Sequence, residues 1–346
     1  MKSLITAVLL VWSGVAAAQD GSRVTRIEQA SGTTALLIAV SPVNDRVVWV
    51  SGTEGTWLRT VDGGATWQGG RVAGADSLQF RDVHAVDERT AYLLSIGNGA
   101  ASRIYKTVDA GASWRLQFAN ADPKVFLDCM DFWSPARGLA VSDAADGRVV
   151  LFGTSDGGAN WDRVLAPTLP PAPEGEGSYA ASGTCLVTRA GGHAWIAAAD
   201  SNRSRVLHSS DHGATWRSDL LPLTTRGGAG VQSLAFHDPL HGIALGGGTT
   251  AQPGDANVAI TADGGRTWAR AGRVPLASGA WGGVVVPGTS ATYVAVGPSG
   301  SAWTRNGGIS WERIDSADYW SVGFASPNAG WAVGKHGRIT KLSGFR

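Results

Sequence analysis

The sequence predicts an all-β fold, a seven-bladed β-propeller whose ring is closed by an N-terminal strand in the last blade. Three observations predict it: an eight-residue motif that recurs six times, a pattern of apolar runs and turns around each motif, and an unusual composition. The 346 residues include 48 Gly and 15 Trp, whereas only 16% are charged. Such a composition is typical of many short strands joined by tight turns.

The recurring motif begins with Thr60 to Trp67, which reads TVDGGATW. Successive copies lie 47, 47, 55, 52 and 43 residues apart, which indicates tandem supersecondary units. We expect the residue at the third position to accept backbone N–H groups within a turn, Gly to adopt a positive φ and Trp to pack on the sheet. The third-position residues, predicted to be structural, are Asp62, Asp109, Asp156, Asp211, Asp263 and Asn306.

Each motif belongs to a longer unit with the order of strands of a propeller blade. Apolar runs such as Phe80 to Val86 and Val231 to Phe236 precede turns such as Ser134 to Gly138, and further strands follow. Four strands in about 45 to 50 residues is the size of one blade. The inner strands of seven blades are expected around Leu37, Val83, Cys129, Cys185, Leu234, Val284 and Val322.

The first residues have the pattern of an export signal. Lys2 is followed by the apolar run Leu4 to Val15 and by three alanines, so residues 1–18 are predicted to be a signal peptide and residues 19–346 a single propeller domain. The mature chain is expected to be periplasmic or secreted, without a membrane span. The formal charge of +1 over the full sequence provides no global field for nucleic acid or for an anionic membrane.

The last unit of the sequence is one strand short. Tyr319 to Gly344 contains three strand-like runs, whereas Arg23 to Gly32 is a spare strand before the first unit. We expect this N-terminal strand to complete the last blade, because that pairing removes an open sheet edge.

The six motifs match the Asp box of neuraminidase-type repeats. Together with seven short blades, the segment Gly330 to Gly334 (GWAVG) and the export signal, they make the chain similar to the photosystem II stability/assembly factor family and its relatives in bacteria without photosystems. The resemblance implies a non-catalytic scaffold, without a cofactor, that holds a client protein in the cell envelope. Sialidases, xyloglucanases and sortilin-like receptors share the Asp box, so the motif specifies fold more than function.

Motifs for several other chemistries are missing. Arg26-Ile27 lacks the Pro that follows in sialidases, and there is no G-x-G-x-x-G, phosphate-binding loop or G-x-S-x-G elbow. His237 and His241 have a ligand-like spacing, but alignment of the repeats places them in a turn. Asp143 to Gly147 offers too few oxygens for Ca²⁺ and is expected to be a solvated turn, so no metal site is predicted.

The repeats also align residues on the face that carries the inner-strand entrances. Residues that precede inner strands and residues that begin third strands lie toward this face, as do the longer loops 167–181 and 246–257. We interpret them as a basic rim with aromatic anchors for the carboxylates of a protein partner; the alternatives are packing between blades and solvated edges. The predicted partner-binding residues are Arg81, Arg103, Arg205, Arg338, Gln232, Trp281 and Trp320.

A second function stays open at this stage. Asp82 and Asp128 precede neighbouring inner strands and could act as the carboxylate pair of a glycoside hydrolase-like propeller, with Trp281 or Trp320 as a sugar platform. Such pairs are about 5 Å apart in retaining enzymes and about 6.5 to 9.5 Å apart in inverting enzymes. The binding scaffold is the leading interpretation and the glycoside hydrolase is the alternative; the sequence does not indicate the client, the sugar or an oligomeric state.

Cys129 and Cys185 are the only cysteines. They fall at the same register in adjacent blades, and export makes oxidation possible. We predict a disulfide, because inner strands converge; the alternative is two buried thiols that act as small apolar residues.

Overall fold

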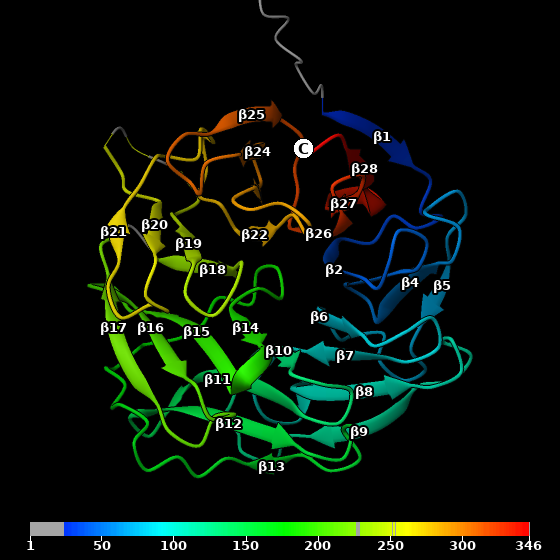
Figure 1. The fold of residues 1–346 in the computed structure, drawn as a ribbon. Coiled ribbons are helices and arrows are strands. Elements are labelled where there is room, and N and C mark those ends of the chain that lie inside the picture. Colours follow the sequence, from blue (N-terminus) through cyan, green and yellow to red (C-terminus); the bar gives the residue numbers. More distant parts are fainter. Residues whose placement is uncertain (1–23, 226–228, 251, 253, 346) are drawn as a thin grey trace, which may run out of the picture.

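The computed structural model describes residues 24–225, 229–250, 252 and 254–345, so the predicted signal peptide lies outside the described residues. The described residues form seven four-stranded antiparallel sheets, arranged as blades around one axis (Figure 1). This confirms the predicted all-β, seven-bladed propeller. The 3-10 helices include η1 (Gly99–Ala101), η2 (Ala190–Gly192) and η4 (Lys335–Gly337). Among the described residues, no helix has the length and apolarity that crossing a bilayer requires.

The first four blades follow one another along the chain, and each runs from an inner to an outer strand. Blade one contains β2 (Leu37–Pro42), β3 (Val48–Gly52), β4 (Thr56–Thr60) and β5 (Gln68–Arg71). Blade two contains β6 (Phe80–Ala85), β7 (Ala91–Ser95), β8 (Arg103–Thr107) and β9 (Arg115–Ala119). Blade three contains β10 (Leu127–Phe132), β11 (Gly138–Ala145), β12 (Arg148–Thr154) and β13 (Asp162–Arg163). Blade four contains β14 (Leu186–Arg189), β15 (His193–Ala199), β16 (Ser204–Ser209) and β17 (Arg217–Leu221).

The last three blades complete the ring. Blade five contains β18 (Val231–Phe236), β19 (Gly242–Gly246), β20 (Val258–Thr261) and β21 (Ala269–Arg270). Blade six contains β22 (Gly282–Val285), β23 (Tyr293–Gly297), β24 (Gly300–Thr304) and β25 (Glu312–Asp315). Blade seven contains β26 (Ser321–Ser326), β27 (Ala329–Val333), β28 (Ile339–Ser343) and, from the other end of the chain, β1 (Thr25–Gln29).

Strand β1 joins blade seven to blade one. It pairs antiparallel with β28, and Glu28 lies opposite Thr340, whose hydroxyl donates to the Glu28 carboxylate at 2.7 Å. On its other side, the indole N–H of Trp67 donates to Gln29 at 3.2 Å. The two ends of the described chain therefore meet in one sheet (Figure 1).

The Asp-box turns connect the third and fourth strands of their blades. In blade one, the Asp62 carboxylate accepts the backbone N–H of Thr66 at 2.9 Å and the hydroxyls of Thr60 and Thr66 at 2.7 and 2.6 Å. These hydrogen bonds hold the pKa of Asp62 well below its usual range. Gly63 has a φ of 74°, which a side chain would disfavour. The same arrangement surrounds Asp109, Asp156, Asp211, Asp263 and Asn306.

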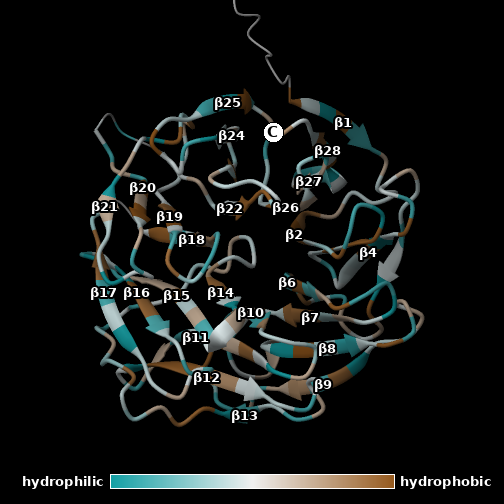
Figure 2. Cartoon of the chain, viewed as in Figure 1, coloured by the Kyte–Doolittle hydropathy of each residue, from teal (hydrophilic) through white to brown (hydrophobic). Residues whose placement is uncertain are grey.

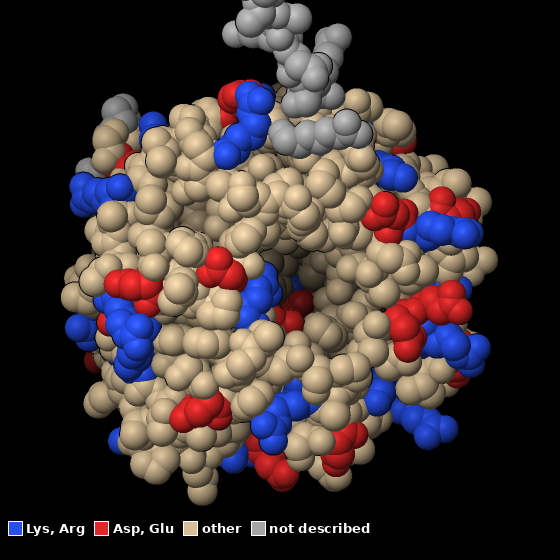
Figure 3. All heavy atoms as spheres, viewed as in Figure 1, with Lys and Arg blue, Asp and Glu red and all other residues tan. Residues whose placement is uncertain are grey.

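Apolar side chains fill the spaces between neighbouring blades. Figure 2 shows more brown on inner strands such as β18 and β22 and more teal on the outer strand β17. All six residues of β18 are buried, whereas most of β17 is partly or fully exposed. On the surface, basic and acidic side chains are interspersed, and the ring is hollowed at its centre (Figure 3).

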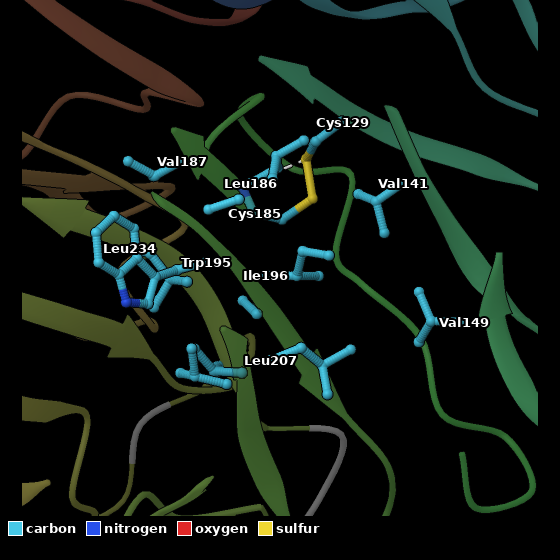
Figure 4. Close-up of a cluster of buried hydrophobic side chains, with 14 of the residues drawn as sticks. Cys129, Val141, Val149, Cys185, Leu186, Val187, Trp195, Ile196, Leu207 and Leu234 are labelled. Carbon is cyan, nitrogen blue, oxygen red and sulfur yellow. Dashed lines mark hydrogen bonds between the residues drawn. A yellow bond between two sulfur atoms is a disulfide. The ribbon is translucent and has the colours of Figure 1, made fainter. Parts of the chain in front are cut away.

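A disulfide lies inside one of these apolar clusters. Cys129 of β10 and Cys185, directly before β14, are bonded, with their Cα atoms 6.1 Å apart. Figure 4 shows the bond among side chains of blades three to five, including Val141, Ile196 and Leu234. The disulfide therefore ties the inner strands of blades three and four together.

Candidate binding site at the mouth of the propeller

A β-bulge at the start of the inner strand gives several blades one extra residue. The register shifts between Leu37 and Ala39, Phe80 and Asp82, Leu127 and Cys129, and Val231 and Ser233. A bulge bends the strand and re-aims the extra side chain, because that residue has no partner of its own in the ladder. The extra residues are Ile38, Arg81, Asp128 and Gln232.

Trp281 and Trp320 hold the corresponding place in blades six and seven. Each precedes its inner strand, and their backbone N–H groups donate to the carbonyls of Val296 at 2.9 Å and Val333 at 2.8 Å. Val296 lies opposite Gly282, the first residue of β22, and Val333 lies opposite Ser321, the first residue of β26. One position per blade thus presents side chains of very different chemistry.

These bulges change the equivalence that the repeats led us to expect. Asp128 corresponds to Arg81, whereas Asp82 corresponds to Cys129, one residue further along the strand. A shift of one residue turns a side chain to the other face. Asp128 lines the mouth cavity, and Asp82 lines a second cavity of about 180 Å³ deeper in the channel. The structure therefore does not assemble Asp82 and Asp128 into one glycosidase-like site.

Four of the predicted partner-binding residues line one cavity of about 380 Å³ at the channel mouth: Arg81, Gln232, Trp281 and Trp320. The two indoles meet edge to face with centroids 4.9 Å apart, and the Arg81 guanidinium lies 5.0 Å from the Trp320 centroid. The guanidinium donates to the side chain of Gln79 and to the carbonyl of Ala180 at 3.0 Å, and it forms no ion pair within the described residues. Burial lowers the pKa of Arg81.

The floor of the mouth cavity is the segment 178–184, which crosses the channel before β14. Its residues bond to several blades: Ala180 accepts from Arg81 of blade two, Ser182 donates to the carbonyl of Trp281 at 2.8 Å, and the hydroxyl of Ser321 in blade seven donates back to Ser182 at 2.9 Å. A green loop at the centre of Figure 1 marks this region. The last residues of the predicted loop 167–181 therefore enter the channel.

Blade three adds a pair of carboxyl groups that the sequence did not reveal. Asp128 is 1% exposed and in contact with the carboxyl group of Asp143, which also lines the mouth cavity. Burial, and then the neighbouring carboxyl group, raise the pKa of Asp128 well above its usual range; burial also raises the pKa of Asp143. Asp143 belongs to a strand, at a second bulge, and not to the solvated turn that we expected. A hydrogen-bonding contact is closer than either glycosidase spacing.

The other three predicted rim arginines lie outside the mouth cavity. Arg205 is 5% exposed and forms a bidentate ion pair with Glu176, so it is not a free rim charge. Arg103 donates to the carbonyl of Ala100 and to the hydroxyl of Tyr105, and Arg338 donates to Glu28 of β1 at 3.1 Å. Of the four arginines predicted to form a basic rim, only Arg81 lines the mouth cavity, and Arg205 is a buried, paired charge.

The deeper cavity faces the Asp-box side of the ring. His84 and Asp131 form a 3.3 Å contact there, and Asp131 also accepts the backbone N–H and the hydroxyl of Thr188. Burial acts to raise the pKa of Asp131, but His84 and these hydrogen bonds outweigh it and lower the pKa. Within the described ranges, no group of three or more His, Cys, Asp or Glu residues is placed to hold a metal ion.

The fold is a seven-bladed β-propeller, and a cavity with aromatic and charged side chains lies at the mouth of its channel. No protein-family model matches the sequence, and no curated protein matches it either. Among solved structures, it is similar to YCF48 bound to D1 peptide (16% identity, TM-score 0.64, 94% of this chain and 98% of that chain). It is also similar to the GH74 xyloglucanase from Xanthomonas campestris (15% identity, TM-score 0.62, 92% of this chain and 53% of that chain) and to an ancestral GH74 enzyme (14% identity, TM-score 0.64, 91% and 46%). The chain spans about half the length of both enzymes. At these identities, the likeness shows a shared fold.

Proposed function

We propose that this chain is a non-catalytic, exported propeller that binds a segment of a client protein in the mouth cavity. The observation that carries the proposal is the convergence of Arg81, Trp281 and Trp320, from three blades, on one cavity. Trp and Arg are the residues most enriched at the energetic centres of protein interfaces. The guanidinium is a planar fork that suits a carboxylate or a backbone carbonyl.

The size and shape of the cavity favour an extended segment. A volume of about 380 Å³ holds a few side chains and cannot admit a folded domain. The structural neighbour YCF48 is bound to a peptide, so a propeller of this fold can hold one. The glycosidase alternative gains no support, because Asp82 and Asp128 line different cavities.

Two features support export. Residues 1–18 have the pattern of a signal peptide, and the disulfide between Cys129 and Cys185 is of a kind that persists in oxidising compartments outside the cytoplasm. The client is therefore expected in the cell envelope.

Site-specific photo-crosslinking tests the proposal. A photoreactive residue at Thr249, an exposed residue that lines the mouth cavity, should form an adduct with an envelope protein in living cells. The same residue at Ile309, 65% exposed on the Asp-box turn of blade six, is the matched control and should form none. Adding Trp320→Ala should abolish the Thr249 adduct. Equal adducts at both positions, or an adduct unaffected by Trp320→Ala, would refute client binding at the mouth.

A further inference from the structure

The wall that blade three contributes to the mouth cavity carries two carboxyl groups in contact. Asp128 is 1% exposed, and its Oδ2 atom has no hydrogen-bond donor among the described residues. It lies against Asp143, whose Oδ1 atom accepts the backbone N–H of Ser178 at 3.0 Å. Two ionised carboxyl groups in contact repel each other, so the pair needs at least one proton; with one proton it carries a single negative charge.

No cation of the described residues neutralises that charge. The groups that perturb the two carboxyl groups include no Lys, Arg or His. Arg81 shares the cavity, but its guanidinium is directed to Gln79, Ala180 and Trp320. A buried charge without a counter-ion is costly, and a cationic ligand group would relieve that cost.

The walls beside the carboxyl pair are aromatic. Phe126, Tyr179, Trp281 and Trp320 line the same cavity. Aromatic faces attract cations, and the guanidinium of Arg81 already lies 5.0 Å from the Trp320 centroid. A carboxyl pair with one buried member and one partly exposed member, next to indole rings, is the chemistry that recognises an ammonium or a guanidinium group.

We propose that Asp128 and Asp143 hold a basic side chain of the bound segment, a lysine or an arginine, against the tryptophan wall. The polypeptide nature of the ligand rests on the proposed function; the cation preference does not. Arg81 uses three of its five N–H groups on Gln79 and Ala180, so two remain for a carbonyl or carboxylate of the same segment. The preferred segment therefore presents a basic side chain next to an acceptor.

Titration with n-butylammonium, and with n-butanol as its neutral isostere, tests the cation preference. The indole N–H signals of Trp281 and Trp320 report binding by NMR. We expect n-butylammonium to bind at least tenfold more tightly than n-butanol. Equal affinities would overturn the proposal, and this comparison needs no variant.

Three variants sharpen the test. Asp128→Asn should keep the preference within about threefold, because its amide can donate to the ionised Asp143 in place of the protonated carboxyl group. The double variant Asp128→Asn with Asp143→Asn should lose it, whereas Asp146→Asn, on the exposed tip of the same hairpin, should leave it unchanged. A double variant that melts like wild type and still prefers n-butylammonium would refute the assignment.

The two proposals fail in different ways. If Thr249 forms its envelope adduct but both probes bind equally, client binding stands and the cation subsite is refuted. If n-butylammonium is preferred but no adduct forms, the subsite stands as a small-cation site and the proposed function fails.

Discussion

Replacing Arg205 with alanine should destabilise the propeller by about 3 to 5 kcal/mol, because it leaves the buried carboxylate of Glu176 without its cation. The Arg205 and Glu176 side chains are 6% and 0% exposed. The guanidinium donates to both carboxylate oxygens, at 2.6 and 2.5 Å, and to the carbonyl of Pro171 at 3.0 Å. The pair thereby pins the Pro-rich insertion to β16.

The magnitude depends on which partner is removed. Arg205→Ala leaves the buried Glu176 carboxylate without a counter-ion. Replacing Arg205 with Met and Glu176 with Leu together removes both charges at similar side-chain volume. Such exchanges of buried pairs are neutral or stabilising by about 1 to 4 kcal/mol. Arg103 begins the third strand of blade two, at the register of Arg205, but forms no ion pair within the described residues. Arg103→Ala should therefore change the free energy of unfolding by less than about 0.5 kcal/mol.

Urea unfolding followed by tryptophan fluorescence measures these free energies. Limited proteolysis adds a local readout, since Arg205→Ala should expose the insertion 167–181 to cleavage before the rest of the ring. The reasoning is refuted if Arg205→Ala and Arg103→Ala cost the same, or if the double replacement is as unstable as Arg205→Ala.

Three further predictions concern the framework. Ala110→Gly should raise the free energy of unfolding by about 1 kcal/mol, because Ala110 has a φ of 68°, which favours glycine. Gly63→Ala, at the equivalent position of blade one, should lower the free energy of unfolding by a similar amount. The midpoints of urea unfolding check both variants. Reducing the disulfide, which links residues 56 apart, should cost about 4 kcal/mol by the chain-entropy estimate, and the unfolded, non-reduced protein should show no free thiols by labelling. Hydrogen bonds from Ser113 hold the pKa of Asp109 at about 2 against a usual 3.8, so its contribution to stability is complete above about pH 5 and is lost as the pH falls through 2. Asp109→Asn should reduce that loss in an acid titration of the melting temperature.

The blades could be predicted from the sequence because every blade repeats the same local chemistry. An Asp-box turn needs a carboxylate or an amide, a glycine, a first hydroxyl and a second hydroxyl or amide within eight residues, and all of these are visible as a motif. Strand β18 matches the expected run Val231 to Phe236, and all six of its residues are buried. Repetition therefore fixes the framework well.

The candidate site depends on features that do not repeat in the sequence. A bulge adds one residue without a sequence signature of its own. Alignment of the repeats therefore pairs Asp82 with Asp128, whereas the structural counterpart of Asp128 is Arg81. Arg205 has the register of a rim residue, but its partner, Glu176, comes from an insertion that only one blade has. Long-range partners of this kind are invisible to a comparison of repeats.

The bulges also place side chains for ligand binding next to side chains that stabilise the fold. Substitutions at two adjacent residues can test this division. Arg81 is the extra residue of its bulge, so its side chain is not needed for pairing within the sheet. The carboxyl group of Asp82, one residue later, accepts the backbone N–H of Met130 across the blade boundary at 2.7 Å. Asp82→Ala should cost about 1 to 3 kcal/mol, because it leaves that buried N–H without an acceptor.

Arg81→Gln should cost less than about 1 kcal/mol, the worth of its contact with Trp320, while it reduces the yield of the Thr249 adduct. Urea midpoints and adduct yields for the two variants give a direct comparison. Equal losses of stability would mean that Arg81, at its bulge position, contributes as much to folding as Asp82 does. A full adduct yield from Arg81→Gln would mean that the arginine does not bind the client. If instead Asp82→Ala lowers the stability and Arg81→Gln lowers the adduct yield, residues at the bulge positions can be exchanged to suit another ligand without loss of the propeller fold.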